Sequence, residues 1–134
     1  LAVTNFFGFR HQLTLEDAVN TFAQDLQTCR TNALSWGDNC RIGITGSQTY
    51  VMERRVGAGS YSVVLAKSLP SGTNFANVST GAWLEFDPRT LLRTSPGFPS
   101  TGGGVVAPEV RITNGDKTFR LILSMTGAVK TAIQ

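Results

Sequence analysis

The sequence predicts an α+β fold in which one long N-terminal helix packs on antiparallel β-sheet. Residues 1–36 have the apolar spacing of a helix, whereas residues 37–134 consist of short segments separated by turn signals. The chain has 134 residues, of which 41% are hydrophobic and 16% are charged. This length and composition exclude a disordered chain and fit a single folded domain over residues 1–134.

The later half of the predicted helix has one face suited to burial. Apolar positions recur there at steps of three and four, which is the helical period. They are Leu15, Val19, Phe22, Leu26, Cys29 and Ala33. A sheet with one apolar face needs a cover, and this stripe can provide it.

No proline interrupts residues 1–36, and the sequence Gly37-Asp38-Asn39 is a helix stop signal. We therefore predict one continuous helix. A second interpretation stays open, because Thr14-Leu15-Glu16-Asp17 resembles a capping box and a new helix would begin at Thr14.

Residues 1–13 form an apolar front to this helix. Their apolar side chains include Leu1, Val3, Phe6, Phe7, Phe9 and Leu13. A helix of this length extends about 50 Å, whereas a compact domain of this size is roughly 30–35 Å wide. We therefore expect the front to extend beyond the domain, to be buried elsewhere, and to be the end of a longer apolar segment.

Six segments after residue 39 have the pattern of strands. They span residues 41–44, 49–56, 61–68, 82–87, 105–112 and 118–125. A hairpin is predicted at Asn114-Gly115, because both residues tolerate positive φ. Alternate apolar residues in the last segment predict that one of its faces belongs to the core.

Two cysteines, Cys29 and Cys40, have ten residues between them. Cys29 lies near the end of the predicted helix and Cys40 at the start of the next segment, so a turn at Gly37 brings them together. We predict a disulfide between them, which would indicate an oxidising compartment. Two reduced, buried cysteines are the alternative.

The net charge of +3 is concentrated at the C-terminal end. After residue 110 the charged residues are Arg111, Lys117, Arg120 and Lys130, opposed only by Asp116. A solvated face is the simpler interpretation of this excess. The alternative is contact with a polyanion such as DNA through Lys117, Arg120 and Lys130, since binding of that kind needs several positive groups on one surface.

The residue types argue against an enzyme. The chain has a single histidine, His11, which lies in the apolar front, and we identify no catalytic residue, cofactor site or metal site. Glu85 and Asp87 share one strand face as paired catalytic carboxylates do, but Leu84 and Phe86 on the other face indicate an ordinary half-buried strand. A binding module or an assembly subunit is therefore expected.

Several motifs occur in a characteristic order. In the helix they are Leu15-Glu16-Asp17-Ala18, Phe22-Ala23-Gln24-Asp25-Leu26 and Arg30-Thr31-Asn32-Ala33-Leu34. Later they are Leu69-Pro70-Ser71-Gly72, Phe86-Asp87-Pro88-Arg89, Ile112-Thr113-Asn114-Gly115 and Ser124-Met125-Thr126-Gly127. Their order and spacing resemble the minor pilins and pseudopilins of the GspH/FimT family, which are subunits of bacterial type IV pili and type II secretion systems.

This resemblance covers nearly the whole chain and implies a pilin-like fold. It implies a leader removed by a prepilin peptidase and an N-terminal helix anchored in the inner membrane, with a periplasmic domain. The apolar front would later pack in the core of a filament, where its partners are other pilins, and the assembled pilus would be extracellular.

We therefore expect a minor pilin that serves type IV pilus assembly, including a pilus for DNA uptake. A type II secretion pseudopilin is the first alternative. The second is a DNA-binding receptor at a pilus tip, because some members of the family bind DNA through a C-terminal Gly-Arg-x-Arg motif. The matching residues here are Gly127-Ala128-Val129-Lys130, in which only Lys130 is positively charged.

Overall fold

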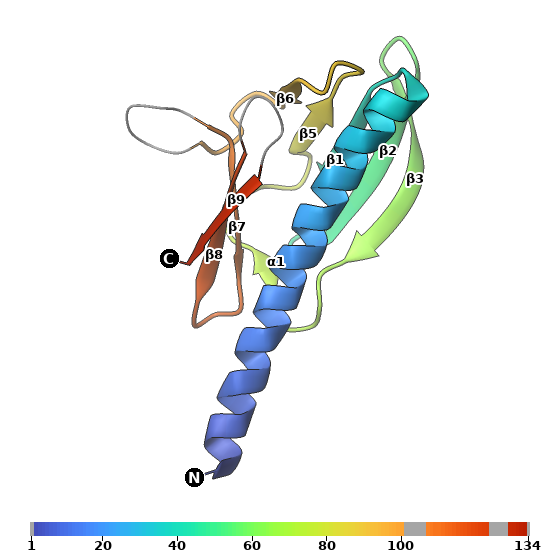
Figure 1. Cartoon of the computed structure of the whole chain (residues 1–134). Coiled ribbons are helices and arrows are strands. Elements are labelled where there is room, and N and C mark those ends of the chain that lie inside the picture. The colour runs from blue at the N-terminus through green and yellow to red at the C-terminus, as the bar shows by residue number, and fades with distance from the viewer. Residues whose placement is uncertain (1, 101–106, 124–128, 134) are drawn as a thin grey trace.

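The computed structural model describes residues 2–100, 107–123 and 129–133, and it describes the side chains of residues 14–100 and 107–123. A long helix, α1 (Ala2–Trp36), lies against two antiparallel sheets (Figure 1). The predicted α+β class is therefore confirmed.

Within the described residues, the first sheet has five strands in the order β3-β2-β1-β5-β6. They are β1 (Cys40–Ile44), β2 (Thr49–Gly57), β3 (Ser60–Ser68), β5 (Trp83–Phe86) and β6 (Leu92–Thr94). The second sheet has four, in the order β4-β7-β8-β9. They are β4 (Asn74–Phe75), β7 (Glu109–Thr113), β8 (Thr118–Leu123) and β9 (Val129–Ile133).

Sequence patterns did not predict β4, β6 or β9. β4 has two residues and β6 has three, which is too short for alternation to be recognised. Of the strand predicted over residues 105–112, β7 begins at Glu109, and Pro108 forms an isolated bridge with Ser100. Residues 105 and 106 lie outside the described part. The alternate apolar residues of β8 are buried, as predicted, up to Leu123. Residues 124–128 lie outside the described part.

The helix is continuous, so the interpretation in which a new helix begins at Thr14 is wrong. It ends where the sequence predicts. Gly37 has a φ of 66°, a conformation that glycine adopts without strain. Its N–H donates a hydrogen bond to the Ala33 carbonyl oxygen at 3.1 Å.

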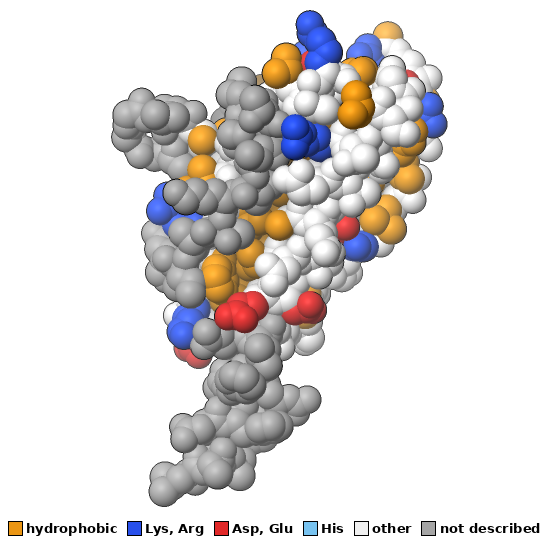
Figure 2. Space-filling view, in the orientation of Figure 1, with side chains coloured by type: hydrophobic (Ala, Val, Ile, Leu, Met, Phe, Trp, Pro, Cys, Tyr) orange, Lys and Arg blue, Asp and Glu red, His pale blue; other side chains and the backbone are white. Residues whose placement is uncertain are grey.

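The two sheets cover only the later part of α1, and the beginning of the helix extends beyond them (Figure 1). Asp and Glu side chains lie near the level at which the helix leaves the sheets (Figure 2). Within the described residues, no helix combines the length and hydropathy needed to cross a membrane.

The predicted stripe on α1 is buried at every position. Leu15, Val19, Phe22, Leu26, Cys29 and Ala33 are at most 2% exposed. Phe22 makes edge-to-face contacts with Tyr50 of β2 and Phe75 of β4, at ring-centroid distances of 5.0 and 5.3 Å. Its ring therefore joins the helix to a strand of each sheet.

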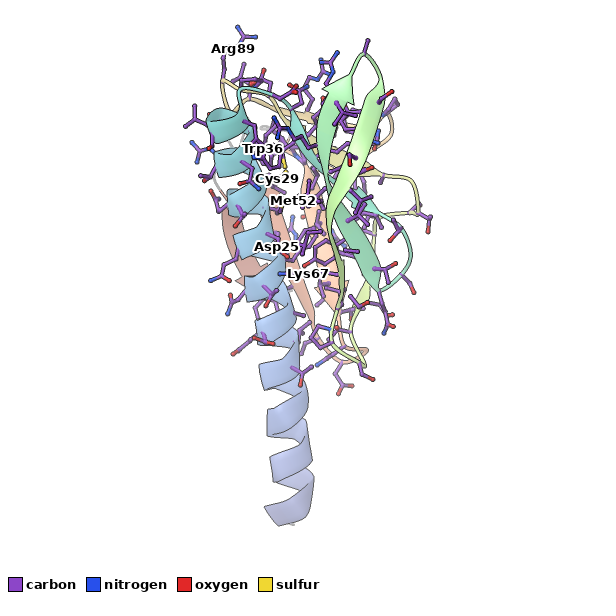
Figure 3. The ribbon with its side chains drawn as sticks, turned by 90° about the vertical axis from the view of Figure 1, so that its right-hand side faces the viewer. Asp25, Cys29, Trp36, Met52, Lys67 and Arg89 are labelled. Carbon is purple, nitrogen blue, oxygen red and sulfur yellow. The ribbon has the colours of Figure 1, made fainter. Side chains whose placement is uncertain are left out.

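One charged residue interrupts this apolar face. Asp25 is 6% exposed and accepts hydrogen bonds from the Tyr50 hydroxyl at 2.5 Å and the Lys67 ammonium at 3.0 Å. Burial and the neighbouring Asp25 carboxylate raise the pKa of Tyr50. Figure 3 shows Asp25 and Lys67 facing each other between α1 and the first sheet. The carboxylate thus ties the helix to β2 and β3.

Cys29 and Cys40 are both buried, and the structure has them as thiols with their sulfurs 2.8 Å apart. The predicted proximity is confirmed, and the disulfide itself stays a prediction. Burial and the adjacent Cys40 raise the pKa of the Cys29 thiol. Because the thiolate is the reactive form, oxidation of the folded protein is expected to be slow.

Replacing Phe22 by Ala is expected to lower the free energy of unfolding by about 3–5 kcal/mol, because the cavity lies where helix and sheets meet. Leu34→Ala on the same helix is the matched control, since Leu34 is 62% exposed, and its expected effect is within about 0.5 kcal/mol. Urea denaturation measures both variants. An equal decrease in the free energy of unfolding for the two variants would contradict a core centred on Phe22.

Refolding in a glutathione buffer is expected to produce a Cys29–Cys40 disulfide and to raise the free energy of unfolding by roughly 2–3 kcal/mol. The same buffer applied to folded, reduced protein is expected to react much more slowly, because the thiols are buried. Mass spectrometry of alkylated protein measures both rates. Two free thiols after oxidative refolding would exclude the disulfide.

Candidate functional site

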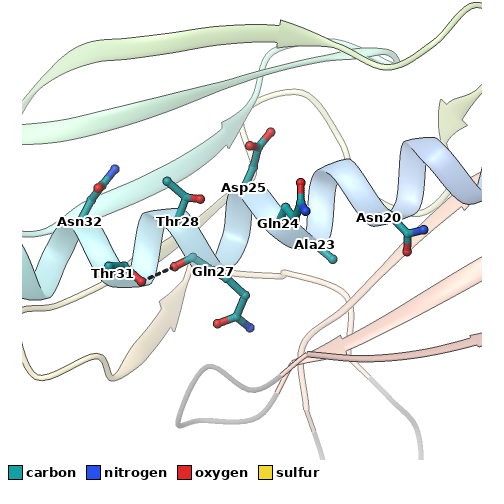
Figure 4. Close-up of a pocket in the computed structure, with 8 residues that line it drawn as sticks. All are labelled: Asn20, Ala23, Gln24, Asp25, Gln27, Thr28, Thr31 and Asn32. Atoms are coloured by element: carbon teal, nitrogen blue, oxygen red, sulfur yellow. Dashed lines mark hydrogen bonds between the residues drawn. The ribbon is translucent and has the colours of Figure 1, made fainter.

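An open groove of about 840 Å³ runs along the surface of α1 (Figure 4). Its lining residues all come from the helix and are mostly amides and hydroxyls. They are Asn20, Ala23, Gln24, Asp25, Gln27, Thr28, Thr31 and Asn32. This surface is the candidate site, and we call it the neutral helix face.

The neutral helix face has no exposed charge. Between residues 18 and 29 the only ionisable group besides the Cys29 thiol is Asp25, which is buried and paired with Lys67. Outward-facing positions of a solvated helix are normally charged or mixed. A 12-residue stretch without such charges can instead pack against another helix. Its amides and hydroxyls can then form hydrogen bonds with the partner helix.

Several side chains on this face have partners within the chain. The Thr31 hydroxyl donates to the Gln27 carbonyl oxygen at 3.0 Å, which is a bond within the helix (Figure 4). The Asn32 amide contacts the Met52 sulfur at 3.4 Å. Sequence analysis missed the neutral helix face, although Asp25 is the only charged residue between residues 18 and 29, which was a visible signal.

The apolar front and this face lie on the same helix, with Glu16 and Asp17 between them. Val3, Phe6, Phe7, Phe9 and Leu13 lie in the backbone of α1, and their side chains are outside the described part. Leu1 also lies outside it. The structure thus places this predicted packing segment on the part of α1 that extends past the sheets (Figure 1).

The register places two of the three predicted polyanion contacts, Arg120 and Lys130, on the same face of the second sheet, and the third in a turn. Arg120 lies on β8, and Lys130 on β9 pairs in register with Ile122, whereas Lys117 lies in the β7–β8 turn. The side chain of Lys130 is outside the described part. Arg120 is half-buried, and its guanidinium donates a hydrogen bond to Glu109.

Glu109 is a buried carboxylate that holds two arginines. It is 2% exposed, and it also accepts a hydrogen bond from Arg111 Nε at 2.9 Å. Arg111 and Arg120 are directly opposite on β7 and β8, where their like charges would repel without Glu109. Much of the basic charge on these strands therefore has an internal role, and sequence analysis missed the acidic partner.

A second buried carboxylate corrects the expectation for Glu85. Sequence analysis assigned it to the more exposed face of an ordinary half-buried strand, but it is 1% exposed. It accepts hydrogen bonds from the Tyr61 hydroxyl, the Asn39 amide at 3.0 Å and the Arg93 guanidinium at 3.0 Å. Burial and the Glu85 carboxylate raise the pKa of Tyr61. The residues that cover Glu85 are distant in sequence, so no local pattern predicts this cluster.

Asp87, which shares a strand face with Glu85, is engaged in the turn that follows β5. Asp87 Oδ1 accepts the backbone N–H groups of Arg89 and Leu91 at 2.8 and 3.0 Å, so it shapes the turn after β5. Within the described residues, no group of three His, Cys, Asp or Glu side chains is placed to hold a metal ion.

Comparison with known proteins identifies no relative. No protein-family model, curated protein or solved structure matches this chain.

Glu109→Ala is expected to lower the free energy of unfolding by about 2–4 kcal/mol, because Arg111 and Arg120 would then face each other without a counter-charge. Asp116→Ala removes a carboxylate from the exposed turn of the same hairpin and is expected to have an effect within about 0.5 kcal/mol. Thermal denaturation compares the two variants. If adding Arg111→Ala to Glu109→Ala restores no stability, repulsion between the arginines is not the cause.

Proposed function

We propose that this chain is a subunit of a pilin-like filament, which it joins through α1. The observation that carries the proposal is the extension of α1 past the sheets, with an apolar sequence at its beginning and the neutral helix face behind it. An extended apolar helix needs a partner that excludes water, and a bundle of equivalent helices provides one.

The motif order described above supports a more specific form of this proposal. We propose a minor pilin with a pilin-like fold, anchored in the inner membrane, with its sheets in the periplasm and other pilins as partners. A type II secretion pseudopilin uses the same helix-mediated assembly, and it remains the alternative within this class.

A DNA-binding receptor at a pilus tip is the weaker proposal. Arg120 and Arg111 both bind Glu109, which offsets part of their charge. Lys117 lies in a turn rather than on the strand face that carries Arg120. These positions leave less positive charge for phosphate groups than the sequence alone indicates.

Gln24→Lys tests the assembly proposal, because it places a charge on the exposed centre of the neutral helix face. We expect incorporation into sheared filaments to fall at least about tenfold, since a charge buried between helices costs well over 1.4 kcal/mol. Cells that express the full-length protein are sheared, and the filament fraction is measured by immunoblot.

Ala58→Lys is the matched control, because it adds the same charge at an exposed position of the β2–β3 turn, outside α1. Both variants are expected to keep the melting temperature of the parent domain. Equal incorporation of the two variants into filaments would contradict assembly through the neutral helix face.

A further inference from the structure

A cavity of about 460 Å³ opens where two loops of the first sheet meet. One loop leads into β5 and the other follows β6. The lining residues are Asn77, Ser79, Thr80, Gly81, Ala82, Trp83, Ser95, Pro96, Gly97, Phe98 and Pro99. None of these residues is charged, and the volume lies in the range of small-ligand pockets.

Two aromatic side chains line the cavity, and they differ in their packing. Phe98 is partly buried and packs against the core. Trp83 is half-buried, on the face of β5 opposite to the core residues Leu84 and Phe86. Its partner in register on β1 is Gly43, which has no side chain, and the Arg41 guanidinium lies over the indole, 5.8 Å from the ring centroid. Trp83 is only half-buried, so part of its aromatic surface remains accessible.

Some polar groups of the cavity bond to other residues of the chain, and others can form hydrogen bonds with a ligand. The Asn77 amide links the cavity to β7, since it donates to the Glu109 carbonyl oxygen at 3.0 Å and accepts from the Arg111 N–H at 2.8 Å. Ser95 Oγ accepts the Trp83 backbone N–H at 3.1 Å, which leaves its own hydroxyl proton to donate. The side chains of Ser79 and Thr80 are exposed at the rim.

We infer that this cavity binds a neutral saccharide. The C–H faces of a pyranose ring stack on aromatic side chains, and Trp83 and Phe98 provide them. Sugar hydroxyls both donate and accept hydrogen bonds, as do the hydroxyls of Ser79, Thr80 and Ser95. A purely apolar ligand would bury these hydroxyls without partners, and a charged ligand would find no counter-charge in the lining.

Cellotriose and triacetylchitotriose are suitable probes, because both are neutral and unbranched. Saturation-transfer NMR on the folded domain is expected to show binding of at least one of them, with a dissociation constant of about 1 mM or tighter. Trp36→Phe leaves Trp83 as the only tryptophan of the chain. When the saccharide is titrated into this variant, the fluorescence of Trp83 is expected to change, and its midpoint should match the dissociation constant from NMR.

Trp83→Ala is expected to weaken binding at least tenfold while Trp36→Phe leaves it unchanged. Ser79→Lys, at an exposed rim position, is expected to weaken binding without affecting folding, and melting temperatures confirm that each variant is folded. The inference is overturned if neither probe shows transfer at about 10 mM. It is also overturned if folded Trp83→Ala or Ser79→Lys binds as well as the parent.

Discussion

The contact on which the rest of this structure depends is the burial of one helix face around Phe22. The aromatic ring of Phe22 meets Tyr50 from the first sheet and Phe75 from the second. Neither sheet closes a core alone, because each has an apolar face that needs a cover. The helix supplies that cover to both, so the relative position of the sheets follows from their shared contact with α1.

Three buried carboxylates then define how this apolar core is assembled. Asp25 joins α1 to β2 and β3, Glu85 joins β5 to β3 and β6, and Glu109 holds a pair of arginines on β7 and β8. Burying a carboxylate is unfavourable unless its partners are in place. Each carboxylate therefore disfavours arrangements of its strands in which these partners are missing.

The features predicted from sequence are those that depend on local spacing. The stripe from Leu15 to Ala33 and the stop at Gly37 are properties of one helix, and both are confirmed. The burial of Glu85 was not predictable, because Tyr61 and Arg93 come from separate segments that only the strand order brings together. The basic C-terminal end was visible in the sequence, but its pairing with Glu109 depends on the register of β7 and β8.

The core and the two proposed binding surfaces use different faces of α1 and of the first sheet, so assembly and ligand binding need not compete with folding. The core uses one side of α1 and leaves the neutral helix face outside, so a partner helix can pack there without breaking a core contact. Trp83 lies on the face of the first sheet that is turned away from the core. A filament built on α1 would therefore leave the proposed saccharide cavity open, and each surface can change in sequence without loss of the core.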